Sequence, residues 1–266
     1  MAPPAGAGRV DGASADDSTG CASRMAAVTA PARATRWSFL GRVPYAPTAE
    51  LQRRVRDALA AGEGPERLLL LEHGHVYTLG RNATEGDVRL SPTELAARGI
   101  EVAVTDRGGQ VTYHGPGQLV GYPILDLSPD RRDIRRYVRD LQEVLVRTLA
   151  DFRVAGEGGE GERIGVWTGG RKIASIGVHL SRWRTTHGFA LNVGTDLGLF
   201  GGIVACGLPD VDMTSIGRES GRTPELREVA ARVVVHFAAV FGRDLAEDAG
   251  FAAAAAGELV AAGAAG

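Results

Sequence analysis

Two side chains that can act as a nucleophile and a base stand out from their surroundings. Cys206 ends the run Gly202-Ile203-Val204-Ala205 and precedes Gly207-Leu208-Pro209, a turn that cannot continue regular structure. A sulfur at such a junction can be exposed at the edge of a pocket. Free cysteine is mostly thiol at neutral pH, so a nucleophilic role requires a nearby cation, base or helix N-terminus. Composition alone favours a small buried hydrophobic residue instead.

Lys172 is the second candidate, because it begins a strand predicted over residues 172–180. This strand follows residues 166–168 and the turn Gly169-Gly170, which together give the strongest hairpin signal in the chain. Strand alternation predicts that Lys172 shares a face with three apolar side chains, Ala174, Ile176 and Val178. A lysine there is unusual, since desolvation favours its neutral form and a neighbouring thiolate its charged form. Spacing alone favours a lysine that reaches into water.

The densest glycine region runs from Asp106 to Gln118. Its paired glycines let the backbone approach a ligand closely and present N–H groups. It contains neither the Gly-Lys-Ser/Thr phosphate loop nor GxGxxG. A tight turn between two strands explains the composition equally well. The six histidines are scattered without the spacing of a zinc site, and His236, beside apolar neighbours on a helix, is interpreted as structural.

Helices and strands must position these residues, and the pattern alternates between the two. Helices are predicted at 48–61 before Gly62, from Ser91 to Gly99 with a capping box, at 134–149, and after Thr223-Pro224 as the last long helix; further strands are predicted at 67–71, 76–80 and 188–193. Hairpins mixed with helices predict an α/β fold of the α+β layer type. We expect a mixed, largely antiparallel sheet flanked by helices, and not a doubly wound parallel sheet.

Composition sets the limits of this domain and of its partners. Of 266 residues, 44% are hydrophobic, and 30 basic residues face 32 acidic ones. No strong field therefore draws the chain to nucleic acid or to a membrane, and no apolar run approaches the roughly 18 to 20 residues of a membrane span. Residues 1–34 are predicted to be a disordered tail, within which Met25 is an alternative start. Residues 35–247 are expected to form a single domain, and residues 248–266 an Ala/Gly-rich tail, either helical or without fixed structure.

With only Cys21 and Cys206 in the chain, neither a disulfide framework nor a cysteine zinc site is expected, and no metal site is predicted. A cytoplasmic enzyme is the default expectation.

Four motifs resemble those of the lipoyl(octanoyl) transferases and occur in the same order, and the resemblance covers residues from about 37 to 242. They are Arg107-Gly108-Gly109-Gln110-Val111-Thr112-Tyr113-His114-Gly115-Pro116-Gly117-Gln118-Leu119, Gly170-Arg171-Lys172-Ile173-Ala174-Ser175-Ile176-Gly177-Val178, His187-Gly188-Phe189-Ala190-Leu191-Asn192 and Ala205-Cys206-Gly207-Leu208. The resemblance implies the catalytic-domain fold shared with biotin and lipoate protein ligases. One departure is the insertion Pro209-Asp210-Val211-Asp212 before Met213-Thr214, a longer loop that can alter access to the thiol.

The resemblance also implies an activity. Cys206 would take an octanoyl group from octanoyl-acyl carrier protein as a thioester, with Lys172 activating the thiol, and pass it to a lysine of lipoyl domains. The acceptors would be the lipoyl domains of 2-oxoacid dehydrogenases and the glycine cleavage H protein, with no cofactor. The implied substrate-binding residues are Arg107, Gly108, Gly109, Gln110, Val111, Thr112, Tyr113, His114, Ser175, Ile176, Gly177, Gly188, Phe189 and Ala190.

Several alternatives stay open at this point. An ATP-dependent lipoate or biotin ligase on the same fold would need no cysteine, transfer between two lipoyl domains would use the same thioester chemistry, and a silent acyl-binding module would use neither. Oxyanion donors are expected among the backbone N–H groups of Gly108-Gly109 or Cys206-Gly207. Four strand residues are candidates for an octanoyl slot, although core packing is their default interpretation: Leu79, Val111, Ile176 and Leu191.

Overall fold

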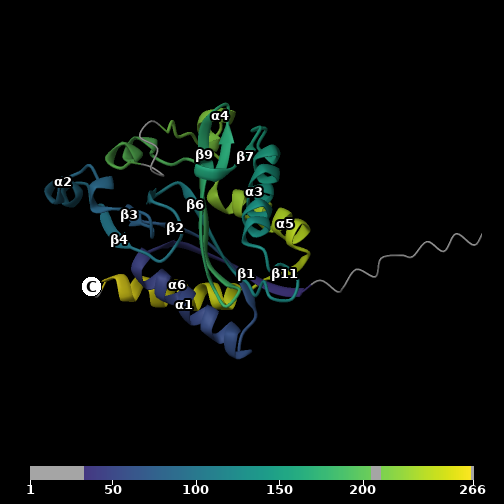
Figure 1. The fold of residues 1–266 in the computed structure, drawn as a ribbon. Helices are drawn as coiled ribbons and strands as arrows, with labels where there is room; N and C mark the ends of the chain where they lie inside the picture. The colour runs from purple at the N-terminus through teal and green to yellow at the C-terminus, as the bar shows by residue number, and fades with distance from the viewer. Residues whose placement is uncertain (1–32, 205–210, 265–266) are drawn as a thin grey trace, which may run out of the picture. The chain divides into compact units, whose positions relative to one another are not determined.

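Four successive leucines, Leu68 to Leu71, form the middle of a central strand, and their side chains alternate between the two faces of a sheet. Leu68 and Leu70 pack on one face, and Leu69 and Leu71 pack on the other. All four are fully buried, because helices cover both faces. The computed structural model describes residues 33–204 and 211–264, which belong to one packed unit (Figure 1).

The large sheet has eight strands in the order β11-β1-β2-β6-β10-β9-β8-β7. Their bounds are β1 Arg33–Val43, β2 Glu66–His73, β6 Gln118–Ile124, β7 Glu157–Gly159, β8 Gly165–Thr168, β9 Arg171–Ser181, β10 Arg184–Asn192 and β11 Arg243–Glu247. β1 pairs in parallel with β2 and β11, and the other neighbours pair antiparallel. The predicted fold class, a mixed and largely antiparallel sheet with flanking helices, is therefore confirmed.

A smaller sheet of three strands lies beside the large one, in the order β4-β3-β5. Its strands are β3 Val76–Leu79, β4 Glu101–Val104 and β5 Val111–His114. Tyr77, Val111 and Tyr113 pack here against Phe200 and Met213. The strands predicted at 67–71 and 76–80 are both present, and they belong to different sheets. The glycine-rich segment therefore connects β4 to β5 and enters β6, where it can reach both sheets.

Two pairs of helices cover the large sheet. α3 (Ile134–Asp151) and α5 (Leu226–Phe241) pack on the face of Leu68, and α1 (Tyr45–Ala61) and α6 (Ala249–Ala264) pack on the face of Leu69 (Figure 1). The short helices are α2 (Pro92–Ala97) and α4 (Ile216–Ser220), with 3₁₀ helices at Glu85–Asp87, Gly161–Arg163 and Leu197–Gly202. Among the described residues, no helix is both long and apolar enough to cross a membrane.

Local sequence signals explain several of these boundaries. Ser91 and Glu94 form the predicted capping box of α2. Gly169 and Gly170 both have positive φ, as a two-residue hairpin turn of this type requires. α5 begins at Leu226, two residues after the Thr223-Pro224 signal, and it is not the last long helix, since α6 follows it.

The alanine-rich C-terminal segment forms a packed helix. Composition left a helix or no fixed structure open, and the structure places residues 249–264 in α6. Alanine is the best helix former, and Ala255 and Leu259, four residues apart, are buried on one side of α6 against the sheet. The packed part of the chain therefore continues past residue 247. At the other end it includes Arg33 and Ala34, because β1 begins at Arg33.

Candidate active site

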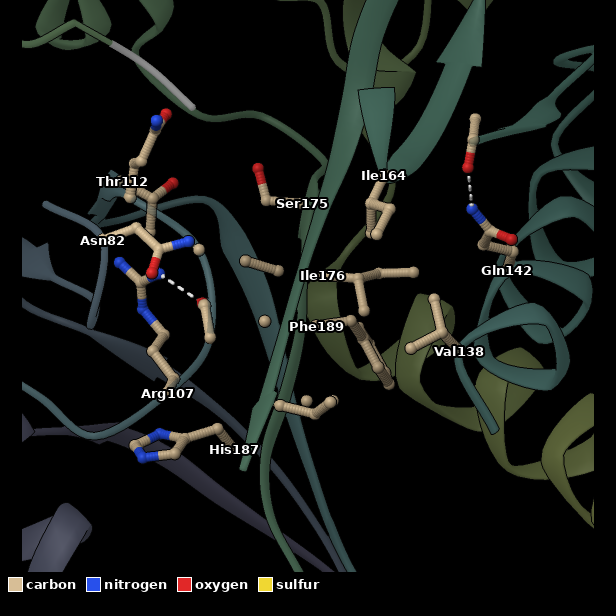
Figure 2. A pocket seen from close by; sticks show the side chains of 18 of the residues that line it. Asn82, Arg107, Thr112, Val138, Gln142, Ile164, Ser175, Ile176, His187 and Phe189 are labelled. Carbon is tan, nitrogen blue, oxygen red and sulfur yellow. Dashed lines mark hydrogen bonds between the residues drawn. The ribbon is translucent and has the colours of Figure 1, made fainter. Parts of the chain in front are cut away.

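A cavity of about 970 Å³ lies where β9 and β10 meet the glycine-rich loop and the first turns of α3 (Figure 2). This volume is at the upper end of the range of small-molecule sites, roughly 300 to 1,000 Å³. Lys172 lines it, together with all the residues that the resemblance implied for substrate binding except one: Arg107, Gly108, Gly109, Gln110, Val111, Thr112, His114, Ser175, Ile176, Gly177, Gly188, Phe189 and Ala190. Tyr113 is the exception, because its ring is fully buried and its hydroxyl lies 2.8 Å from Nδ1 of His75.

The loop of residues 107–110 closes over β9 through backbone contacts that only glycines allow. Gly108 N–H donates to the carbonyl of Val178 at 2.9 Å. A methyl group at Gly177 would lie 3.0 Å from the Gly108 carbonyl oxygen, and one at Gly80 only 2.3 Å from that of Gly109. The Gly108 N–H is thus already donated within the protein, so of the expected oxyanion donors in this loop Gly109 remains.

Arg107 carries a buried charge at the root of this loop. Its guanidinium donates to the carbonyl and to the hydroxyl oxygen of Thr78, with 2.8 Å from Nη2 to Oγ1. These bonds fasten the loop to β3 of the small sheet. A charge-assisted hydrogen bond is stronger than a neutral one, so the arginine fixes the position of the glycines that follow it.

An irregularity in the pairing of β8 with β9 decides which way Lys172 faces. Val166 pairs with Ala174, but the next residue, Trp167, pairs with Lys172, so that β9 accommodates one extra residue, Ile173. Ile173 and Ala174 both pack in the core beneath α3. Such a bulge reverses the alternation of side chains beyond it. Lys172 and Trp167 therefore lie on the face opposite to this core.

The predicted face of Lys172 was wrong for this reason, and so was the alternative in which it reaches into water. Lys172 shares its face with Ser175 and Gly177, and only 1% of it is exposed. Its Nζ lies 5.5 Å from the ring centre of Trp167. A methyl group at Gly165 would lie 3.3 Å from this nitrogen. The amine is thus held inside the protein at the wall of the cavity.

The backbone of Lys172 binds the segment that follows Cys206 in the sequence. Lys172 N–H donates to the carbonyl of Asp212 at 2.8 Å, and Thr214 N–H donates to the carbonyl of Lys172 at 2.9 Å. Met213 forms a parallel bridge with Lys172 between these bonds. Cys206 itself, with residues 205–210, lies outside the described residues.

Asn192, in the third motif, ties this segment to the cavity. Its Nδ2 donates to the carbonyl of Thr214 at 3.0 Å, and its Oδ1 accepts from Nε2 of Gln118 at 3.0 Å. Gln118 Oε1 in turn lies 2.8 Å from Nδ1 of His114. On the far side, the Thr214 hydroxyl donates to Glu219. The chain of hydrogen bonds links the cavity wall to the segment at Lys172.

Two buried, neutral histidines lie side by side here, His114 in the cavity wall and His73 behind it. His73 Nδ1–H donates to the carbonyl of Val43 at 2.8 Å, and its Nε2 is 2.9 Å from the hydroxyl of Tyr122. Burial lowers the pKa of His73 to about 4. Burial, and then the proximity of His73, lowers the pKa of His114 to about 3. Tyr45 stacks on His114 with ring centres 6.1 Å apart.

His187, at the opposite end of the cavity from Lys172 along the strands, has a strained backbone. Its φ is +58°, which is unusual for a residue with a Cβ, and its ring nitrogen lies 2.7 Å from Asp106. This hydrogen bond is the main reason why the pKa of Asp106 falls below its usual range. Burial lowers the pKa of His187. The pair fastens the loop to β10.

Several lining residues have no signal in the sequence. α3 contributes Val138 and Gln142, and Asn82, Tyr122 and Ile164 come from elsewhere (Figure 2). Val138 lies within the predicted helix of residues 134–149, and spacing cannot distinguish a helix face that packs in a core from one that lines a cavity. Of the four expected slot residues, Val111 and Ile176 line the cavity, whereas Leu79 and Leu191 pack in the cores.

Comparison with known proteins agrees with this architecture. The model of the family described as lipoyl protein ligase A/B catalytic domain matches residues 44–238. The chain is 48% identical to an octanoyltransferase of Solibacter usitatus over 81% of this chain and 96% of the relative. It is 47% identical to an octanoyltransferase of Chloroflexus aurantiacus over 76% of this chain and 92% of the relative. A solved structure of Ta0514, a lipoate protein ligase homologue from T. acidophilum with bound lipoic acid, has a TM-score of 0.67 at 18% identity and covers 85% of this chain and 94% of its own.

Structural similarity at such low sequence identity establishes only that the two proteins share a fold. The family model, by contrast, matches most of the chain and establishes the family. With its cavity at the glycine-rich loop and the buried lysine on β9, the chain belongs to the lipoyl protein ligase A/B catalytic domain family.

Proposed function

We propose that the protein is an octanoyltransferase of protein lipoylation. It takes the octanoyl group of octanoyl-acyl carrier protein onto Cys206 as a thioester and passes it to a lysine of a lipoyl domain. The relatives named octanoyltransferase, 47% and 48% identical over most of the chain, support the overall transfer. The acceptors are the lipoyl domains of 2-oxoacid dehydrogenases and the glycine cleavage H protein.

The buried amine of Lys172 is the observation that carries this proposal. A lysine that is 1% exposed needs a function or a partner to offset its desolvation. Its backbone is bonded to Asp212 and Thr214, only six and eight positions after Cys206. These bonds support a meeting of the two side chains at the cavity.

In the first step the Cys206 thiolate attacks the carbonyl carbon of the donor thioester. The tetrahedral intermediate collapses, the bond from carbon to the donor sulfur breaks, and the departing thiolate takes a proton from the Lys172 ammonium. The products are an octanoyl-enzyme, a free carrier thiol and a neutral Lys172. One thioester replaces another, so the step is close to balanced.

In the second step Lys172 takes a proton from the acceptor ammonium, and the resulting amine attacks the acyl-enzyme. The bond from carbon to Cys206 sulfur breaks, the nitrogen loses its second proton to solvent, and the thiolate–ammonium pair is restored. Conversion of a thioester into an amide is downhill, so no ATP is consumed.

Transfer from octanoyl-carrier protein to a lipoyl domain tests this function, with and without ATP and Mg²⁺. We expect equal product in both conditions, none from Cys206→Ser or Cys206→Ala, and little from Lys172→Ala. Product formation by Cys206→Ala that depends on ATP would instead favour a ligase. An octanoyl-lipoyl domain added as an alternative donor tests transfer between two lipoyl domains.

A further inference from the structure

Within residues 33–204 and 211–264, no strand pairs with β9 on one side over the second half of its length. β8 begins only at Gly165, and its pairing with β9 extends along β9 no further than Ala174. Further along, Gly108 N–H binds the carbonyl of Val178. Ile176 lies between these two points and lines the cavity. The cavity thus passes around this open edge, from the glycine-rich loop on one side of β9 to α3 on the other (Figure 2).

The backbone N–H and C=O groups of Ile176 point away from β10 and into the cavity. Hydrogen-bonded and non-bonded pairs alternate along an antiparallel ladder. The pair of Val178 with His187 is a non-bonded one, because the Val178 carbonyl binds Gly108 and the His187 N–H donates to a glutamine side chain of α1. Two residues along, Ile176 pairs with Phe189 in the same orientation.

No described residue forms a hydrogen bond with the outward-facing N–H and C=O of Ile176. A free donor and a free acceptor on one residue are what an added extended chain with amide groups binds. The Lys172 amine packs against Gly165, the first residue of β8. In the register of β8 and β9, Gly165 lies opposite Ser175, so the amine is close to the point at which the unpaired edge of β9 begins. Ser175 precedes Ile176 by one residue, about 3.3 Å along the strand.

The walls beyond Ile176 are apolar first and charged at the rim. Val138 of α3 and Ile164 both line this part of the cavity (Figure 2). Arg135 and Arg139, one turn apart on α3, line its exposed end, and neither forms an ion pair with a described residue. Glu160 and Glu162 also line this part and limit the positive potential. From Ile176 outward, this branch of the cavity therefore offers backbone hydrogen-bonding groups, then apolar side chains, then positive charges. It suits an occupant that carries amide, aliphatic and anionic groups in that order.

We propose that this branch of the cavity, between the open edge of β9 and α3, binds the phosphopantetheine arm of the acyl donor. The proposal rests on the proposed function and adds the site of the donor's arm to it. From its sulfur outward, the arm carries two amides, a dimethyl-substituted carbon and a phosphodiester. The first amide pairs with Ile176, the aliphatic part packs on Val138 and Ile164, and the phosphodiester lies at Arg135 and Arg139.

The octanoyl chain occupies the other branch, on the face of Lys172. Ser175 and Ala190, which pair across β9 and β10, form its floor with small side chains. The thioester then lies at the junction of the two branches, beside the Lys172 amine.

A pair of small donors tests the contact with Ile176. Octanoyl-N-acetylcysteamine has the first amide of the arm, and its ester analogue replaces the N–H with oxygen at the same length. We expect kcat/KM for acyl-enzyme formation to be about tenfold lower for the ester, the equivalent of about 1.4 kcal/mol, because the Ile176 carbonyl loses its donor. Each rate is divided by that of the same donor with a free thiol in solution. Equal normalised values would overturn the proposal.

A second comparison tests the arginines. The phosphate of octanoyl-phosphopantetheine is expected to raise kcat/KM several-fold over octanoyl-pantetheine, because each exposed ion pair with an arginine contributes only weakly. We expect Arg135→Ala with Arg139→Ala to abolish this gain, and Arg136→Ala to keep it, because Arg136 lies on the same helix and does not line the cavity. An equal gain in the double variant, or slower deacylation of its preformed acyl-enzyme by the lipoyl domain, would contradict the assignment.

These outcomes are distinct from failure of the proposed function. If no thioester acylates the wild-type protein, the proposed function itself is wrong. If every thioester acylates it at the same normalised rate, the function stands and the site of the arm is wrong.

Discussion

A shift from pH 7.5 to pH 5 is expected to lower the free energy of unfolding by about 4 kcal/mol through two buried histidines. Burial lowers the pKa of His73 to about 4 and that of His114 to about 3. In the unfolded chain both return to about 6.5. Between pH 7.5 and pH 5 the unfolded state binds protons at these two sites that the folded state does not bind. The contribution of the neutral histidines to the free energy of unfolding is therefore fully present above about pH 7.5 and is lost as the pH falls through 6.5.

The magnitude follows from linkage. At pH 5 each unfolded histidine is almost fully protonated and each folded one almost neutral, which gives about 2 kcal/mol per site. At pH 7.5 the same expression gives less than about 0.1 kcal/mol per site. Since the folded pKa values lie at or below 4, the result at pH 5 depends mainly on the unfolded value.

Urea unfolding at pH 7.5, 6.5, 5.5 and 5.0, followed by tryptophan fluorescence, measures this loss. His114→Gln removes one of the two sites, and we expect about 2 kcal/mol less destabilisation between pH 7.5 and 5 than in the wild type. His236→Gln, a partly exposed histidine on α5, is the matched control for the loss of a histidine as such. If His114→Gln loses stability with falling pH as steeply as the wild type, His114 is not buried in its neutral form.

Four substitutions test other parts of the fold and the site. Asn192→Ala leaves the carbonyl of Thr214 without its donor, and we expect a loss of about 2 to 4 kcal/mol in urea unfolding, since it also deprives a glutamine of its acceptor; a loss below about 0.5 kcal/mol would refute the network. Leu259→Ala should cost about 2 to 4 kcal/mol if α6 is packed, and no change would mean that it is not. Gly257→Ala, with open space around it, should raise stability by up to about 1 kcal/mol, and a fall in Tm would contradict this. Gly177→Ala should displace the glycine-rich loop, and we expect a clear fall in the rate of acyl-enzyme formation with only a small fall in Tm. An unchanged rate would contradict the close approach of the Gly108 carbonyl to Gly177.

The elements that the sequence predicts correctly are those with strong local signals. The hairpin of β8 and β9 follows from Gly169-Gly170, and α3 from its apolar period. The hairpin turn between β9 and β10 has no such signal, because Arg182 and Trp183 adopt positive φ there without glycine. β6 was not predicted, since Gly121 and Pro123 interrupt it; a methyl group at Gly121 would strike the ring of Phe189.

The candidate site also has features that the sequence predicts and features that depend on the folded chain. By resemblance to a family, the motifs indicated Lys172 and about half of the residues that line the cavity. Spacing alone gave Lys172 the wrong face, because one extra residue in β9, Ile173, reverses the alternation, and this depends on pairing with β8. Nor can periodicity show whether Lys172 and Cys206, 34 positions apart, belong to one site. The bonds from Lys172 to Asp212 and Thr214 are contacts that only the folded chain provides.

The most direct test of the central claim is isolation of the acyl-enzyme and its chase. Wild-type protein is incubated with octanoyl-carrier protein alone, desalted and mapped by peptide mass, and an apo-lipoyl domain is then added. We predict one octanoyl group on Cys206, lost on addition of the domain as one octanoyl group is gained by the domain lysine. An octanoyl group on another residue, or an adduct on Cys206 that the lipoyl domain does not discharge, would contradict the proposed mechanism.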